Sequence, residues 1–135
     1  MNVIEGTATT PASREQIWRL LADASTWSRW GTWSNVQVEG GGEHALGAIR
    51  VLRQGPYRVR ERVTDWQPGQ RMAYELLEGM SVRDYRSVVT LEDAPAGGTL
   101  VRWRSTYERA GLITKLLLRL AVREAPRRLA RAAAA

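Results

Sequence analysis

The chain has 135 residues, of which 44% are hydrophobic and 25% charged, which is typical of a single soluble globular domain with its own core. It contains no cysteine and one histidine, His44, so disulfides, cysteine nucleophiles and multi-histidine metal sites are excluded. The net charge is +6, and Lys115 is the sole lysine among the basic residues.

The first residues of the chain indicate where the protein is located, and its basic residues indicate whether it binds nucleic acid. Residues 1–5 lack the basic start and apolar core of a signal peptide, and no stretch is apolar enough to span a membrane, so we expect a cytoplasmic protein. Arg58, Arg60 and Arg62 alternate with other residues, as solvent-facing positions of a strand do. Because no nucleic-acid recognition motif accompanies them, we expect no nucleic-acid partner.

The first elements carry clear boundary signals. Val3 to Thr10 is predicted to be a strand that ends at a proline. Ser13 and Gln16 form a capping-box pattern, which predicts a helix that ends near Ala24. Three tryptophans within residues 27–33 follow, in a segment predicted to be a short second helix or a turn.

Alternating segments separated by turn residues then predict six strands. Val36 and Val38 belong to a short first one, and the other five are Gly47–Gln54, Tyr57–Trp66, Arg71–Leu77, Val82–Glu92 and Thr99–Glu108. The short connections favour an antiparallel meander.

A long apolar helix is predicted from Leu112 to Val122, and Pro126 is expected to kink it or to end its regular part near Ala125. A basic stripe recurs every four residues at Lys115, Arg119, Arg123 and Arg127. We interpret this stripe as a solvated face; the alternative is contact with an anionic membrane surface.

Strands followed by one large helix indicate an α+β fold in which the helix covers an antiparallel sheet. Several segments also resemble the polyketide cyclase/dehydrase-like branch of the START-like (SRPBCC) superfamily. The resemblance rests on residues 11–18, Ala22-Asp23 with Trp27 and Trp30, and residues 59–63, 74–76, 82–85 and 98–103. It covers nearly the whole chain.

The resemblance implies the helix-grip fold, a seven-stranded antiparallel sheet wrapped around the long C-terminal helix, with two short helices after the first strand. It implies one START-like domain over residues 1–135, with a cavity for a small hydrophobic molecule between sheet and helix. We expect no cofactor and no metal. The superfamily has no shared catalytic motif, so three functions stay open: a carrier or sensor of an aromatic or polyketide-like molecule, a polyketide aromatase/cyclase-like enzyme, and a lipid-handling protein at a membrane surface.

Alternation within that fold selects the residues expected to face the cavity. From the strands and the tryptophan segment they are Trp30, Glu61, Tyr74, Tyr85, Ser87, Trp103, Ser105 and Tyr107. From the last helix they are Ile113, Leu116, Leu117 and Leu120, of which Leu116 and Leu120 are candidate ligand contacts.

Glu61 is the candidate catalytic residue, because a carboxylate between Val59 and Val63 on a core face is costly unless it is paired. It is either a general base or ligand anchor, or a structural partner of an arginine such as Arg53. Each tyrosine is either a ligand contact or a core aromatic residue. Trp30 either lines the pocket or caps the open end of the sheet.

Overall fold

A computed structural model describes residues 1–39 and 45–135; His44 and most of the glycine-rich loop lie outside the described residues. The elements are β1 (Asn2–Thr10), α1 (Arg14–Ala22), a 3₁₀ turn η1 (Ala24–Thr26), α2 (Trp27–Trp30), β2 (Asn35–Val38), β3 (Ile49–Gln54), β4 (Tyr57–Gln67), β5 (Arg71–Glu78), β6 (Val82–Arg83), β7 (Arg86–Asp93), β8 (Thr99–Tyr107), β9 (Arg109–Ala110) and α3 (Leu112–Ala134).

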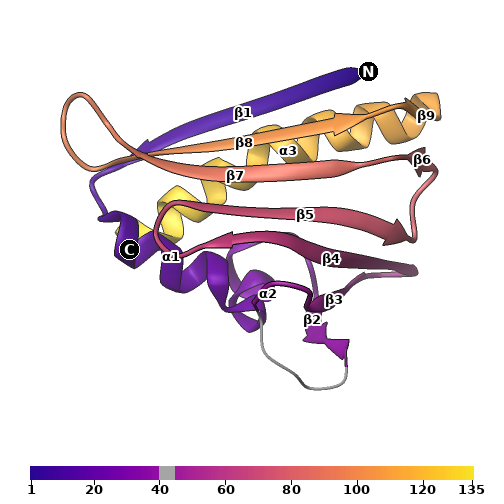
Figure 1. Cartoon of the computed structure of the whole chain (residues 1–135), viewed down its shortest axis with the longest axis horizontal. Coiled ribbons are helices and arrows are strands. Elements are labelled where there is room, and N and C mark those ends of the chain that lie inside the picture. Colours follow the sequence, from indigo (N-terminus) through magenta and orange to yellow (C-terminus); the bar gives the residue numbers. More distant parts are fainter. Residues whose placement is uncertain (40–44) are drawn as a thin grey trace.

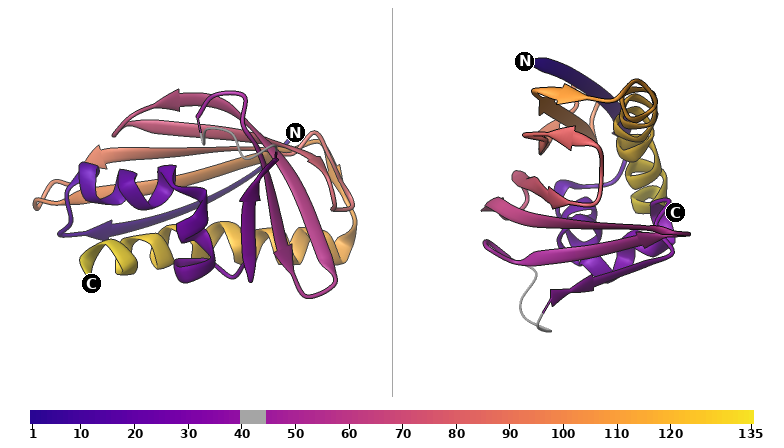
Figure 2. Two further views of the ribbon diagram at one scale, coloured as in Figure 1. Left: turned by 90° about the horizontal axis from the view of Figure 1, so that it is seen from below. Right: turned by 90° about the vertical axis from the view of Figure 1, so that its right-hand side faces the viewer.

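Seven strands form one antiparallel sheet in the order β1-β8-β7-β5-β4-β3-β2, and β6 pairs with β9 in a separate small ladder. The sheet is strongly curved, and α3 lies along its concave side (Figure 1, Figure 2). The helices α1 and α2 close the same side near the C-terminal end of α3. The predicted α+β helix-grip architecture is confirmed.

The start of α1 follows the predicted capping box. The Gln16 backbone N–H donates to Ser13 Oγ at 3.1 Å, and the Ser13 N–H donates to Gln16 Oε1 at 2.8 Å. These two bonds satisfy donors that the first helical turn would otherwise leave open. The helix then buries Ile17 and Leu21 and ends at Ala22, slightly earlier than predicted.

The predicted strand Val82–Glu92 is interrupted. Asp84 has a φ of 54°, a left-handed conformation that cannot continue a strand, and it separates β6 from β7. Asp tolerates this conformation better than most residues do, and the alternating pattern on either side conceals the break.

Of the two outcomes expected at Pro126, a kink or an end near Ala125, the second is wrong, because the last helix continues through Pro126 to Ala134. Proline cannot donate to the carbonyl four residues earlier, which is that of Val122. This carbonyl meets β1 at Gly6, where an added Cβ would lie 2.4 Å from the Val122 oxygen. The lack of a side chain at Gly6 therefore lets α3 approach the sheet closely.

The buried side of α3 also differs from the prediction. Its inward residues are Leu118, Val122, Pro126, Leu129 and Ala130. The expected inward set, Ile113, Leu116, Leu117 and Leu120, is exposed. The error arises because the first half of this helix is apolar on both faces, and periodicity alone does not say which face meets the sheet.

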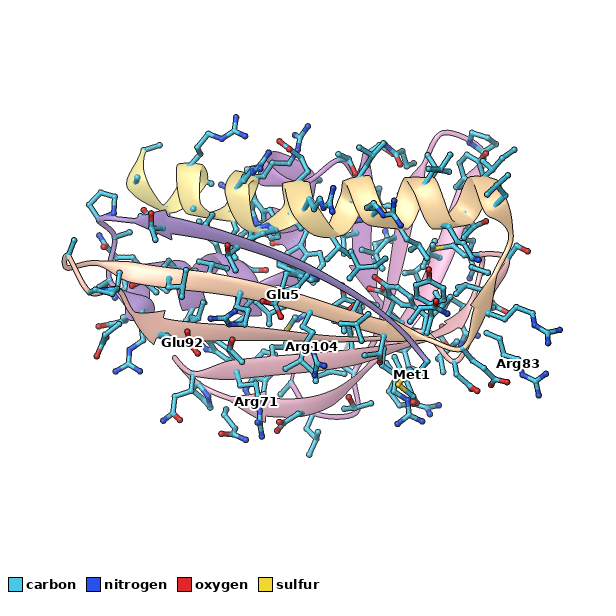
Figure 3. All side chains as sticks on the ribbon, turned by 90° about the horizontal axis from the view of Figure 1, so that it is seen from above. Met1, Glu5, Arg71, Arg83, Glu92 and Arg104 are labelled. Carbon is cyan, nitrogen blue, oxygen red and sulfur yellow. The ribbon has the colours of Figure 1, made fainter. Side chains whose placement is uncertain are left out.

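The outer face of the sheet carries the predicted solvent-facing arginines. Arg60 lies 2.9 Å from Glu39, and Arg102 lies 2.7 Å from Glu5. Figure 3 shows Glu5, Glu92 and Arg104 on the side of the sheet away from α3. Such exposed pairs contribute little stability each, but they account for much of the arginine content.

Candidate functional site

Glu61 lies on the concave face of β4, where it is 7% exposed. Val59 and Val63, on the same face of the strand, are 2% and 1% exposed. The register between β4 and β5 shifts at Glu61, so the carboxyl sits at a local irregularity of the sheet. The predicted inward position of Glu61 is confirmed.

The residue opposite Glu61 on the neighbouring strand is Arg50. Directly opposed residues project to the same face, so both ionisable side chains lie in the interior. Arg50 is 1% exposed, its Nη2 donates to the Ala22 carbonyl at 3.2 Å, and its guanidinium carbon lies 5.0 Å from the centre of the Trp27 ring. Arg53, the partner suggested by the sequence, is exposed. Arg50, not Arg53, lies beside Glu61, because Arg50 and Leu52 are the residues of β3 that project to the inner face.

Burial dominates the electrostatics of this pair. It raises the pKa of the Glu61 carboxyl from 4.5 to about 8, and the positive charge of Arg50 offsets only part of that rise. Burial also lowers the pKa of Arg50 from 12.5 to about 10, against the opposing effect of Glu61. At neutral pH the carboxyl is therefore mainly protonated and the guanidinium charged.

Hydroxyl groups from β5, β7 and β8, and from Tyr85 just before β7, line the interior next to this pair. Tyr85 Oη donates to Ser105 Oγ at 2.9 Å, and Ser105 Oγ lies 2.6 Å from Ser87 Oγ. Burial is the largest effect on the Tyr74 and Tyr85 phenols and raises the pKa of both. Their hydrogen bonds oppose this rise, and Glu61, once ionised, adds to it. The two phenols are thus held as neutral groups within the electrostatic reach of the Glu61 carboxyl.

An aromatic group borders these polar residues. Trp103 Nε1 donates to Tyr74 Oη at 3.1 Å, and Trp27 stands edge-on to both rings, with centroids 6.0 and 6.3 Å away. Trp30 packs on Trp27 and Trp103 and donates from Nε1 to Thr26 Oγ1 at 3.1 Å. These rings, tilted or edge-on to one another, give the site an apolar aromatic wall.

The structure brings most of the sequence-predicted residues together on one face. Glu61, Tyr74, Tyr85, Ser87, Trp103 and Ser105 surround the polar interior, and Trp30 lies in its aromatic wall. Tyr107 is buried on the same face of β8, two positions beyond Ser105. Leu116 and Leu120 are 55% and 67% exposed and do not line the interior.

Sequence reasoning missed Arg50, and among the tryptophans it preferred Trp30 to Trp27. Alternation on β3 places Arg50 and Leu52 on one face, which could have suggested Arg50, but an arginine in a basic chain looks like a surface residue. Trp27 precedes the predicted pocket tryptophan, and only the turn formed by η1 and α2 shows that it points inward.

Two open hollows lie on the surface near the C-terminal half of α3. One, of about 320 Å³, is lined by Arg29, Trp30, Arg128, Arg131 and Ala132. The other, of about 380 Å³, is bordered by residues 8–11, at and just after the end of β1, and by α3. Trp30 is the residue that connects the first hollow with the aromatic wall of the interior.

These groups can bind a polar substituent and exchange a proton with it. A carboxyl with a pKa near neutrality both donates and accepts protons, and the hydroxyls offer oriented donors and acceptors. Within the described residues, no cluster of three or more His, Cys, Asp or Glu side chains could hold a metal ion.

A family model described as "Polyketide cyclase / dehydrase and lipid transport" matches residues 1–135. An uncharacterized protein of Mycobacterium tuberculosis, Rv2574, is 30% identical over 87% of this chain and 75% of its own length.

Solved structures share the fold. XoxI from Bacillus cereus aligns with a TM-score of 0.82 at 17% identity, covering 98% of this chain and 95% of that one. A protein from Nitrosospira multiformis gives a TM-score of 0.80 at 19% identity, over 96% and 94% of the two chains. At these identities the likeness concerns the fold alone.

Proposed function

The chain belongs to the polyketide cyclase / dehydrase and lipid transport family, and from this premise we propose that it binds a small, mainly apolar molecule that carries a polar group. The polar group meets Glu61, Arg50 and the hydroxyls of the inner face. The apolar part contacts the rings of Trp27, Trp30 and Trp103. This interior is the same face from which the sequence predicted a binding site.

One observation carries the proposal: a buried carboxyl lies opposite a buried arginine inside an aromatic core. Placing two ionisable groups away from water is expensive, and an apolar pair of similar volume would stabilise the fold as well or better. Groups with strongly shifted pKa values occur preferentially at functional sites. A ligand that uses both groups explains why they are there.

Trp30 supports a route into the interior. The inner side chains pack closely on one another, so a ligand must displace one of them to enter. Trp30 lines the surface hollow of about 320 Å³ and also packs on Trp103, 6.4 Å away between ring centres. Movement of this ring would join the hollow to the polar interior.

The raised pKa of Glu61 favours a second candidate function, an aromatase/cyclase-like enzyme. In such an enzyme the ionised carboxyl removes a proton from a carbon between two carbonyl groups. Phenols such as those of Tyr74 and Tyr85 would donate hydrogen bonds to the carbonyl oxygen that gains negative charge. A binding module needs the same groups only as a fixed polar anchor.

A thermal-shift screen of flavonoids, polyketide-like aromatics and fatty acids tests binding, because a ligand of the folded state raises the melting temperature by mass action. Tryptophan fluorescence gives an independent signal, since three tryptophans form the wall. We expect at least one class to raise the melting temperature and to change the emission.

The variant Glu61→Gln keeps the shape of the protonated carboxyl but removes its acidity, and Glu75→Gln on the outer face is the matched control. We expect weaker binding of the best compound to Glu61→Gln alone, with both variants folded. Unchanged affinity in folded Glu61→Gln would reject the role of Glu61. Turnover of a poly-β-keto thioester by wild type and not by Glu61→Gln would select the enzyme over the binding module.

A further inference from the structure

The first half of α3 presents large apolar side chains to solvent. Leu112, Ile113, Leu116, Leu117 and Leu120 form this outer apolar face, and their exposed fractions are 76%, 74%, 55%, 55% and 67%. At 3.6 residues per turn they share the side of the helix opposite to buried Leu118 and Val122. A continuous apolar patch of this kind marks an interaction surface.

Cations border the outer apolar face. Lys115, Arg119 and Arg123 recur every fourth residue along one flank, and residues 112–123 contain no acidic residue. In the part of the chain that the structure describes, none of the three has an ion-pair partner, whereas Arg127, Arg128 and Arg131 in the second half share Glu124. The apolar first half of α3 is therefore also the half whose positive charges have no acidic partner among the described residues.

We infer that this outer apolar face docks on an anionic lipid surface. Leucine and isoleucine would enter the boundary between head groups and acyl chains, while the flanking cations meet the lipid phosphates. In the described ranges 1–39 and 45–135, no helix is long and apolar enough to cross a bilayer, so the contact is one of α3 lying along the surface.

Charge selects lipid over a second copy of the chain. Pairing of two such faces would bring two sets of the same three uncompensated cations to one interface. An anionic membrane instead supplies the missing negative charge. The inference does not rest on the proposed ligand: the inner face and the outer apolar face lie on opposite sides of α3, so either can fail without the other.

Vesicle co-sedimentation tests the docking, with vesicles of phosphatidylcholine alone and of phosphatidylcholine mixed with phosphatidylglycerol. The apolar variant is Leu116→Gln with Leu120→Gln, and its control is Tyr57→Gln, an exposed apolar residue of β4. The charge variant is Lys115→Gln with Arg119→Gln, and its control is Arg53→Gln with Arg86→Gln, two exposed arginines of the sheet.

We expect wild type to bind the anionic vesicles, to bind the neutral ones much less, and to be released by added salt. The apolar variant should bind roughly tenfold less or weaker still, the charge variant should lose the preference for anionic lipid, and both controls should bind like wild type. All substituted side chains are at least partly exposed, so unchanged melting curves will show that the folds are intact.

Three results would overturn the inference. One is no vesicle binding by wild type. Another is equal binding by wild type and the apolar variant. The third comes from sedimentation velocity: a wild-type dimer that the apolar variant converts to monomer, without lipid binding, would assign this face to a second copy.

Discussion

Replacing Glu61 with glutamine should change how the stability of the protein depends on pH. The carboxyl has a pKa of about 8 in the folded protein, against 4.5 without burial. Between these values the folded state binds more protons than the unfolded state, so the wild type loses stability as pH rises. The stabilisation is complete below pH 4.5 and is lost as pH rises through about 8.

The slope of this loss follows from linkage and is about 1.4 kcal/mol per pH unit inside the window. Glutamine does not titrate, so Glu61→Gln lacks this term, while every other titrating group is common to both proteins. From pH 5 to pH 7 the free energy of unfolding of wild type should therefore fall by roughly 3 kcal/mol relative to the variant.

Guanidinium chloride unfolding of both proteins at pH 5, 6, 7 and 8 measures this difference directly. Glu75→Gln, which removes a carboxylate paired with Arg62 on the outer face, is the control and should show no such slope. A wild-type minus Glu61→Gln difference that stays constant from pH 5 to pH 8 would refute the reasoning. It would mean that Arg50 keeps Glu61 ionised in the folded protein.

Two further substitutions test the packing around the site. Gly6→Ala places a Cβ 2.4 Å from the Val122 oxygen, so it should lower the free energy of unfolding by roughly 1–3 kcal/mol. Thr7→Ala, on the exposed side of β1, should change it little. Equal free energies of unfolding for the two variants, measured by denaturant unfolding, would contradict the close approach of α3. Ser105→Ala leaves the buried hydroxyls of Tyr85 and Ser87 short of a partner, at a cost of about 1–3 kcal/mol. Adding Ser87→Ala should cost less than the two single changes summed, and strict additivity would argue against a shared network.

Local signals account for the parts of the fold that the sequence predicted correctly. Ser13 and Gln16 specify the start of α1 through two short-range hydrogen bonds. Alternation places Glu61 and Ser87 on the inner face because a strand has only two faces, and one of them is visibly apolar. In these cases the information lies within a few residues of the element concerned.

Predictions failed where the answer depends on contacts between distant segments. The orientation of α3 is set by the meeting of Val122 with Gly6, two residues far apart in the chain, and the leucine-rich half of the helix shows no polar face to reveal its direction. Pro126 is tolerated inside α3, although proline usually ends a helix, and the carbonyl that it leaves without its helical donor is the one that meets Gly6.

The partner of Glu61 illustrates the same limit. Arg50 lies opposite Glu61 only because of the register between β3 and β4, which no local pattern determines. A basic chain offers many arginines as partners, and Arg53, the example taken from the sequence, is exposed. The candidate site could thus be predicted as a face of the sheet, but not as a charge pair.

Native mass spectrometry of freshly purified wild type and Glu61→Gln tests the central claim, that the inner face binds a small apolar molecule through its polar groups. We predict that part of the wild type carries a bound small molecule, released by denaturation, and that Glu61→Gln carries much less of it. Wild type found only at the mass of the bare chain, and unchanged after incubation with every compound of the screen, would contradict the account.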